Sequence, residues 1–228
     1  IKRVAAIIAW TLRAVKGFGV KLTNPGGTEA WQWGKNVTCI RDPVPYFEVT
    51  PAEIIRSVVE ANELLHLPHS VHLHCNNLGT PGNYTCTLGS MGLIPDLNKK
   101  RQTLYATHVQ FHAYGGSDWK DFCSKSEPIA NFVNMRPQIV MDMGQVMFGR
   151  TTTMTADGPM EFNLYRLHHD KWSNHDVELE TGSGIIPVIY RRKNLVNSIM
   201  WAIGLELALL TKSPWQCLLT TDNPNGAP

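Results

Sequence analysis

Two pairs of histidines lie in or just after segments that have the composition of β-strands. His72 and His74 are two residues apart, and His108 and His112 are four residues apart. Residues at even spacings on a strand point to the same face, so each pair is expected to share a face of its strand, with Gln110 on the face of His108 and His112. Neutral imidazole nitrogen is a common zinc ligand, and these pairs therefore predict a metal site.

A lysine and an aspartate occupy comparable positions in two further strand-like segments. Asp222 follows an apolar run, and carboxylate oxygen is a normal zinc ligand. Lys21 lies in a short strand-like segment that it is expected to end. An ammonium group repels a cation, so lysine becomes a ligand only when deprotonated or after reaction with carbon dioxide. The resulting carbamate has two anionic oxygens that can bridge two metal ions. Without further information, an ordinary lysine at a strand end is the simpler interpretation.

Strand-like and helix-like segments alternate along the whole chain. Strands are expected at 20–22, 70–74, 103–111, 138–141 and 216–221. Helices are expected at 4–16, 50–67, in a segment that ends near Leu93, and at 128–135 and 193–211. Thr50, Pro51 and Glu53 form a strong start signal for the second of these helices. Strands separated by helix-length segments predict βαβ units and a parallel sheet.

The pattern favours a (β/α) barrel over a nucleotide-binding α/β fold. Neither the glycine-rich dinucleotide fingerprint nor the phosphate-binding loop motif occurs in the sequence. Polar residues follow successive strands, and the active site of a barrel is built at the carboxyl ends of its strands. The polar, turn-rich residues 150–184 are expected to form an irregular insertion or small hairpins.

Composition excludes several classes of protein. The chain has 228 residues, of which 43% are hydrophobic and 18% charged, so it is neither disordered nor a coiled coil. Its net charge of +2 predicts no nucleic-acid or membrane partner. The 5 cysteines include no C-x-x-C pair, which favours reduced thiols in the cytoplasm. The longest apolar stretch, residues 195–210, is shorter than the roughly 20 residues of a membrane span and predicts a buried helix.

Five stretches of the chain resemble the amidohydrolase-like subunit of formylmethanofuran dehydrogenase and its bacterial relatives in the formyltransferase/hydrolase complex, which are similar to the wider amidohydrolase superfamily. They are Gly19–Gly27, Pro68–Gly79, Thr107–Gly116, Asp142–Gly149 and Thr220–Pro228. The resemblance runs over essentially the whole chain. It implies an α/β fold, the distorted (β/α)8 TIM barrel of amidohydrolases, of which residues 1–228 form the C-terminal part from about strand 4 to strand 8. The N-terminal strands, with an H-x-H ligand pair, would lie before Ile1.

The same resemblance implies a centre of two Zn²⁺ ions. Lys21 matches the carboxylated lysine that bridges the two ions. His108 matches the ligand on strand 6, and Asp222 matches the carboxylate on strand 8, which is also the catalytic acid and base. The ligand on strand 5 is either His74, which lies nearer the end of the strand, or His72, which the superfamily pattern favours.

Further residues in these stretches are candidates for substrate contacts. Asn76 and Asn77 follow the second strand, and His112 follows His108, so all three are expected to face a bound substrate. Asn223 stands where the family usually has histidine after the aspartate. Because an amide takes no proton near neutral pH, this departure implies either an altered proton transfer or a purely orienting role for that position.

The activity implied is hydrolysis of an N-formyl amine on a methanofuran-type one-carbon carrier, which gives formate and the free amine. The alternatives are the reverse condensation of formate with methanofuran, the hydrolysis of another amide, and a non-catalytic scaffold role. The implied partners are the other subunits of a formyltransferase/hydrolase or formylmethanofuran dehydrogenase complex, in the cytoplasm. The 228-residue segment alone is expected to be inactive, because the barrel would not close without its first strands.

Overall fold

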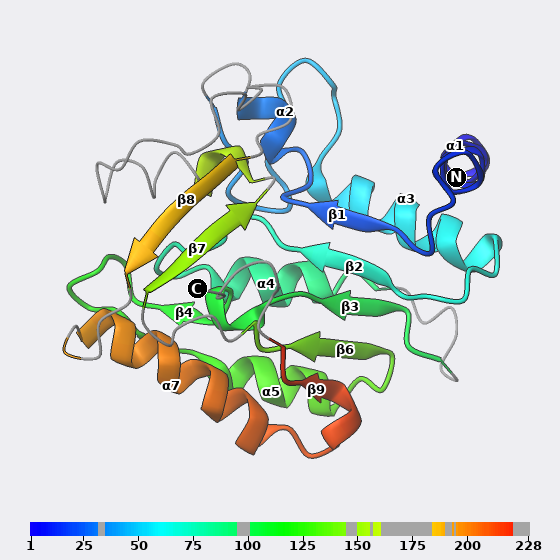
Figure 1. The fold of residues 1–228 in the computed structure, drawn as a ribbon. Coiled ribbons are helices and arrows are strands. Elements are labelled where there is room, and N and C mark those ends of the chain that lie inside the picture. Colours follow the sequence, from blue (N-terminus) through cyan, green and yellow to red (C-terminus); the bar gives the residue numbers. More distant parts are fainter. Residues whose placement is uncertain are drawn as a thin grey trace.

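The centre of the fold is a five-stranded parallel sheet in the order β1-β2-β3-β6-β9 (Figure 1). Its strands are β1 (Lys21–Thr23), β2 (Val71–His74), β3 (Leu104–Ala106), β6 (Ile139–Asp142) and β9 (Cys217–Leu218). In this computed structural model the described residues are 1–31, 35–94, 101–144, 150–155, 157–160, 184–189, 193 and 195–220. All four strand pairs are parallel, and the strands lie side by side in chain order, as the alternating sequence pattern predicts.

Helices connect the strands and cover one face of the sheet, where α3, α4 and α5 lie behind the strands in Figure 1. The α-helices are α1 (Lys2–Val15), α2 (Gly27–Trp31), α3 (Pro51–Leu64), α4 (Tyr84–Met91), α5 (Ser126–Asn134) and α7 (Leu195–Leu210), and the 3-10 helices are η1 (Val109–Phe111) and η2 (Pro214–Gln216). The start signal of α3 is confirmed, because Thr50 and Glu53 form a reciprocal capping box.

The two faces of the sheet differ in burial. On the face packed against the helices, Leu73, Ala106 and Met141 lie in register and are almost completely buried. Lys21 and His72 are also in register, one residue earlier on their strands, and therefore lie on the opposite face. Lys21 is exposed there, and His72 is half-buried.

Two antiparallel pairs accompany the central sheet. They are β4 (Tyr114–Gly115) with β5 (Cys123–Ser124), and β7 (Arg150–Thr155) with β8 (Gly184–Ile189). The second pair agrees with the hairpins expected within residues 150–184, although residues 156 and 161–183 lie outside the described part of the chain. The boundary of an insertion at these residues stays a prediction.

The expected strand at 103–111 is wrong beyond its first half. β3 ends at Ala106, His108 has a left-handed backbone with φ of 39°, and residues 109–111 form η1. The parity argument for His108, Gln110 and His112 therefore fails. The amide of Gln110 donates instead to the carbonyl oxygen of Met200 in α7, at 2.8 Å.

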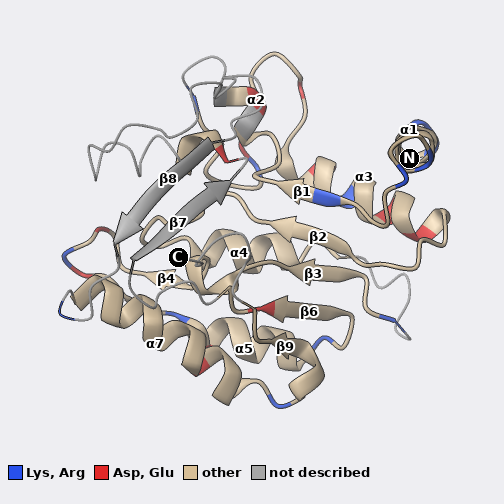
Figure 2. Ribbon diagram, in the orientation of Figure 1, with Lys and Arg blue, Asp and Glu red and all other residues tan. Residues whose placement is uncertain are grey.

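Two smaller expectations also need correction. Lys21 begins β1 rather than ending it, and β9 covers only two residues of the expected strand at 216–221, because the chain there first forms η2. Charged groups of both signs are interspersed over the described residues, apart from a basic concentration on α1 (Figure 2). Of the helices that the structure describes, none combines the length and the apolar character of a membrane span.

Candidate metal centre

β2 carries His74 to the carboxyl edge of the sheet. Val71 and Leu73 alternate with the histidines and are completely buried against the helices, which sets the register of the strand. His74 is the last residue of β2, lies beside Thr23 of β1 and is only 2% exposed. Strand register and burial therefore place the His74 ring in the loops above the sheet, the usual position of an active site in a parallel α/β fold.

A sharp turn after β3 brings in the second histidine. The backbone N–H of His108 donates to the carboxylate of Asp142, at 2.9 Å, and Asp142 also accepts a hydrogen bond from the Thr220 hydroxyl, at 2.7 Å. These contacts hold the left-handed backbone of His108. Gly144 packs so closely against this turn that a Cβ atom added there would lie 2.3 Å from the Cβ of His108. The turn thus requires glycine at position 144.

The 3-10 turn η1 returns the chain so that His112 lies beside His108. The two rings stack with their centroids 5.6 Å apart, and the His112 centroid is 5.5 Å from that of His74. A helical turn, and not a shared strand face, therefore brings His112 to the other two histidines.

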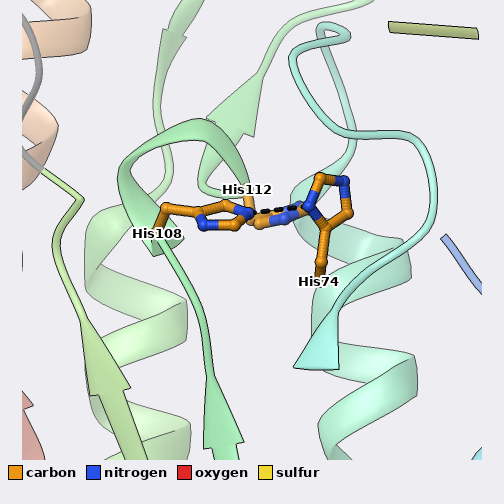
Figure 3. Close-up of side chains that lie close together, drawn as sticks. All are labelled: His74, His108 and His112. Carbon is orange, nitrogen blue, oxygen red and sulfur yellow. Dashed lines mark hydrogen bonds between the residues drawn. The ribbon is translucent and has the colours of Figure 1, made fainter. Parts of the chain in front are cut away.

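The three imidazoles converge on one buried point (Figure 3). The Nδ1 atom of His74 and the Nε2 atom of His108 are 2.8 Å apart, and one ring nitrogen from each of the three residues lies within 4.8 Å of the others. Neither ring nitrogen of His112 has a hydrogen-bond partner among the described residues, although His112 is only 1% exposed. Buried polar atoms are normally satisfied, so this arrangement fits a bound metal ion.

Asp157 completes the cluster and was not anticipated from the sequence. Its Oδ2 atom lies 2.8 Å from Nε2 of His74, and its side chain is 2% exposed. The residue lies 83 positions after His74, in the segment expected to be irregular. No strand periodicity or motif marks Asp157, so only the three-dimensional structure identifies it.

Burial keeps the imidazoles neutral. It lowers the pKa of His74, assisted by the neighbouring His108 and Lys21 and opposed by the hydrogen bond to Asp157. Burial, together with His74 and His108, holds the pKa of His112 well below its usual value. A neutral ring has a lone pair for a metal ion, whereas a protonated ring has none.

These lowered pKa values predict that the metal-free protein loses stability in acid. His74 and His112 bind protons more readily in the unfolded chain, so their contribution is complete above the unfolded pKa of about 6.5 and declines as pH falls below it. The slope is about 1.4 kcal/mol per pH unit for each group between its two pKa values. Urea unfolding of the metal-free protein from pH 8 to pH 5 measures this decline.

A variant pair tests the assignment of this decline. His112→Gln removes one of the titrating groups and is expected to flatten the fall in stability below about pH 6.5. The same replacement at His66, an exposed residue, is the matched control. An identical decline in wild type and His112→Gln would contradict the assignment to His112.

The other expected metal ligands are distributed unevenly. His72 stacks on Tyr105, with centroids 4.4 Å apart, and does not belong to the buried cluster. Lys21 lies in register with His72 and points to the same face of the sheet as His74, two residues below the level of that histidine. Asp222 and Asn223 lie outside the described residues.

The two asparagines expected to contact substrate have protein partners. Asn76 is completely buried, and its amide nitrogen donates to Asn24 and to the carbonyl oxygen of Pro25, each at 2.8 Å. Asn77 has a positive φ of 62°, and its carbonyl oxygen accepts a hydrogen bond from Asn83. Their roles as substrate contacts stay predictions.

A buried histidine cluster at the carboxyl edge of a parallel sheet is an arrangement typical of metal-dependent hydrolases built on barrels. Comparison with known families identifies the class, since the amidohydrolase family model matches residues 1–228 and the chain belongs to this family.

Particular relatives narrow the position within the family. The chain is 55% identical to protein FwdA of Methanocaldococcus jannaschii over 234 aligned residues, and 35% identical to the FhcA component of the formyltransferase/hydrolase complex of Methylorubrum extorquens over 232. The matches cover 100% and 98% of this chain. The X-ray structure of the complex FhcABCD from Methylorubrum extorquens, in complex with methylofuran, matches 99% of the chain with a TM-score of 0.88 and 34% identity.

These relatives are much longer than the present chain, which spans 41% of each. The match confirms the resemblance found in the sequence motifs and the partial barrel fold that it implies. The five parallel strands correspond to this fold class.

Proposed function

We propose that this chain forms part of a metal-dependent amidohydrolase that cleaves an N-formyl amine on a methanofuran-type carrier to formate and the free amine. The observation that carries the proposal is the convergence of His74, His108 and His112 in a buried cluster, within a chain of the amidohydrolase family. Three imidazoles are a familiar ligand set for catalytic zinc.

The histidine cluster supplies the ligands for one metal ion, and Lys21, as a carbamate, is proposed to bridge it to a second. Lys21 and His74 point to the same face of the sheet, and the side chain of Lys21 is exposed, so carbon dioxide has access to its amine. When bound, zinc would supply Lewis-acid polarisation of the formyl carbonyl and a nucleophile at neutral pH.

The remaining chemistry is a proton transfer. We assign it to the Asp222 carboxylate, which would take a proton during attack on the formyl carbon and deliver it to the nitrogen of the leaving amine. The neighbouring Asn223 is proposed to orient this carboxylate by a hydrogen bond, since an amide does not exchange a proton near neutral pH.

The proposed substrate class rests on the relatives. The matched solved structure is that of a formyltransferase/hydrolase complex with methylofuran. A furan-type carrier with a formylated amine is therefore the first substrate to test, with Asn76 and Asn77 as proposed contacts. Its assembly with a formyltransferase and further subunits, in the cytoplasm, is proposed on the same basis.

Metal analysis together with a hydrolysis assay tests the function. The full-length protein is expected to contain about two zinc ions per chain and to release formate from an N-formyl furan-type carrier. A hydantoin-type cyclic amide is the comparison substrate and is expected to remain intact. A full-length protein without bound metal would instead identify a scaffold protein, and hydrolysis of the cyclic amide alone would identify another amidohydrolase.

Condensation of formate with the amine is the second candidate direction. The resemblance associates it with archaeal members of the family, and the identity of 55% to the Methanocaldococcus protein, against 35% to the Methylorubrum protein, favours it. The same side chains serve both directions. Assays started from formate plus free amine and from the formyl carrier separate the two.

A further inference from the structure

The position of Asp157 beside His74 raises the question of which His74 nitrogen is available to a metal ion. We propose that Asp157 is a positioning residue that fixes the tautomer of His74, so that the Nδ1 lone pair points into the histidine cluster. This inference rests on the metal centre proposed above and adds a residue to it that acts through a ligand.

A chain of amide side chains fixes the orientation of Asp157. The carbonyl oxygen of Pro25 only accepts hydrogen bonds, so the group of Asn76 that faces it, at 2.8 Å, is the amide nitrogen. The same nitrogen donates to Oδ1 of Asn24, at 2.8 Å. The nitrogen of Asn24 therefore points away and donates to Oδ1 of Asp157, at 3.1 Å.

The two carboxylate oxygens of Asp157 consequently have different roles. Oδ1 accepts from Asn24 and from the backbone N–H of Met160, at 3.2 Å. Oδ2 lies 2.8 Å from Nε2 of His74. Because an ionised carboxylate only accepts hydrogen bonds, Nε2 of His74 carries the hydrogen.

The tautomer of His74 then follows. A neutral imidazole with its hydrogen on Nε2 has its lone pair on Nδ1, and this atom is the one that lies 2.8 Å from Nε2 of His108. The lone pair of His74 is thus directed at the point where the three histidines converge. Ligand histidines are commonly oriented in this way by a carboxylate on the opposite ring nitrogen.

The isosteric substitution Asp157→Asn is expected to reverse this arrangement. The donors Asn24 and Met160 hold the carbonyl oxygen of the new amide in the position of Oδ1, since the opposite orientation would place donors against a donor. Its amide nitrogen then faces Nε2 of His74, which must accept. The hydrogen of His74 moves to Nδ1, and the metal ligand is lost.

The test measures zinc affinity of the full-length protein by competition with a chelator, supported by the visible spectrum of the Co²⁺-loaded form. Asp157→Asn is expected to lower zinc affinity about 10–100-fold, as does Asp157→Ala, and to alter the Co²⁺ spectrum. A purely structural role predicts a different result, because Asp157→Asn retains the contacts to Asn24 and Met160 and only Asp157→Ala loses them.

Controls separate the possible failures. Asp42→Asn, in a loop where the carboxylate accepts backbone N–H groups of Thr38 and Cys39, is expected to bind zinc like wild type. Asp157→Glu and Asp157→Gln repeat the comparison of carboxylate and amide if Asp157→Asn does not fold, with Glu expected to bind more tightly. Wild-type affinity in folded Asp157→Asn overturns the positioning role, whereas absence of zinc from wild type overturns the proposed centre itself.

Discussion

Replacement of His108 by alanine is expected to abolish tight zinc binding and, with it, hydrolysis of the formyl carrier. The Nε2 atom of His108 lies 2.8 Å from Nδ1 of His74, at the centre of the buried cluster. Loss of a partner that merely orients a ligand costs about 10–100-fold in metal affinity, so loss of a ligand itself is expected to cost more than this. Zinc content after dialysis and formate release by the full-length protein measure the two effects.

Folding must be monitored in the same experiment. The left-handed backbone at His108 is held by main-chain and Asp142 contacts that alanine retains, so we expect the variant to fold. His72→Ala is the informative control, because His72 stacks on Tyr105 outside the cluster. The reverse pattern, with zinc lost from His72→Ala and kept by His108→Ala, would refute the assignment of the ligands.

The order of elements follows from local signals that do not depend on tertiary contacts. Thr50 and Glu53 mark the start of α3 by reciprocal capping, and the structure has this box as expected. Alternation of buried apolar residues with histidine identifies β2. Such signals act within a few residues, so the sequence is sufficient to place the strands and helices of the parallel sheet.

The turn at His108 depends on contacts that sequence periodicity does not contain. Residues 103–111 have the composition of one long strand, yet β3 ends at Ala106. The chain turns because the carboxylate of Asp142, 34 positions away, binds the backbone N–H of His108, and because Gly144 leaves room for it. A distant contact thus overrides the local strand propensity.

The choice between His72 and His74 shows the same limit. Both lie on one face of β2, and parity alone treats them as equivalent. Burial distinguishes them, since His74 is 2% exposed beneath the loops whereas His72 is half-buried beside Tyr105. Asp157 reaches His74 across 83 positions, so the side chain that orients the ring belongs to a segment without any recognisable pattern.

Replacement of Lys21 by alanine is expected to reduce activity by roughly a thousandfold or more. A bridging carbamate is proposed to hold the second metal ion, and Lewis-acid stabilisation by a metal contributes several kcal/mol, at about 1.4 kcal/mol per factor of ten. Lys21 suits this role because it lies on the face of the sheet that carries His74 and is open to solvent. Steady-state hydrolysis by the full-length protein, with zinc content measured in parallel, provides the test.

Chemical rescue distinguishes a carbamate from an ordinary ammonium group at Lys21. A short carboxylic acid offers the two oxygens of a carbamate, so acetate or propionate is expected to restore part of the activity of Lys21→Ala. For the same reason, zinc uptake by the metal-free wild type is expected to require bicarbonate. Lys120→Ala, at an exposed surface position, is the matched control and is expected to retain full activity. Full activity of Lys21→Ala without added acid would refute the bridging role, because no second source of the two oxygens would then be needed.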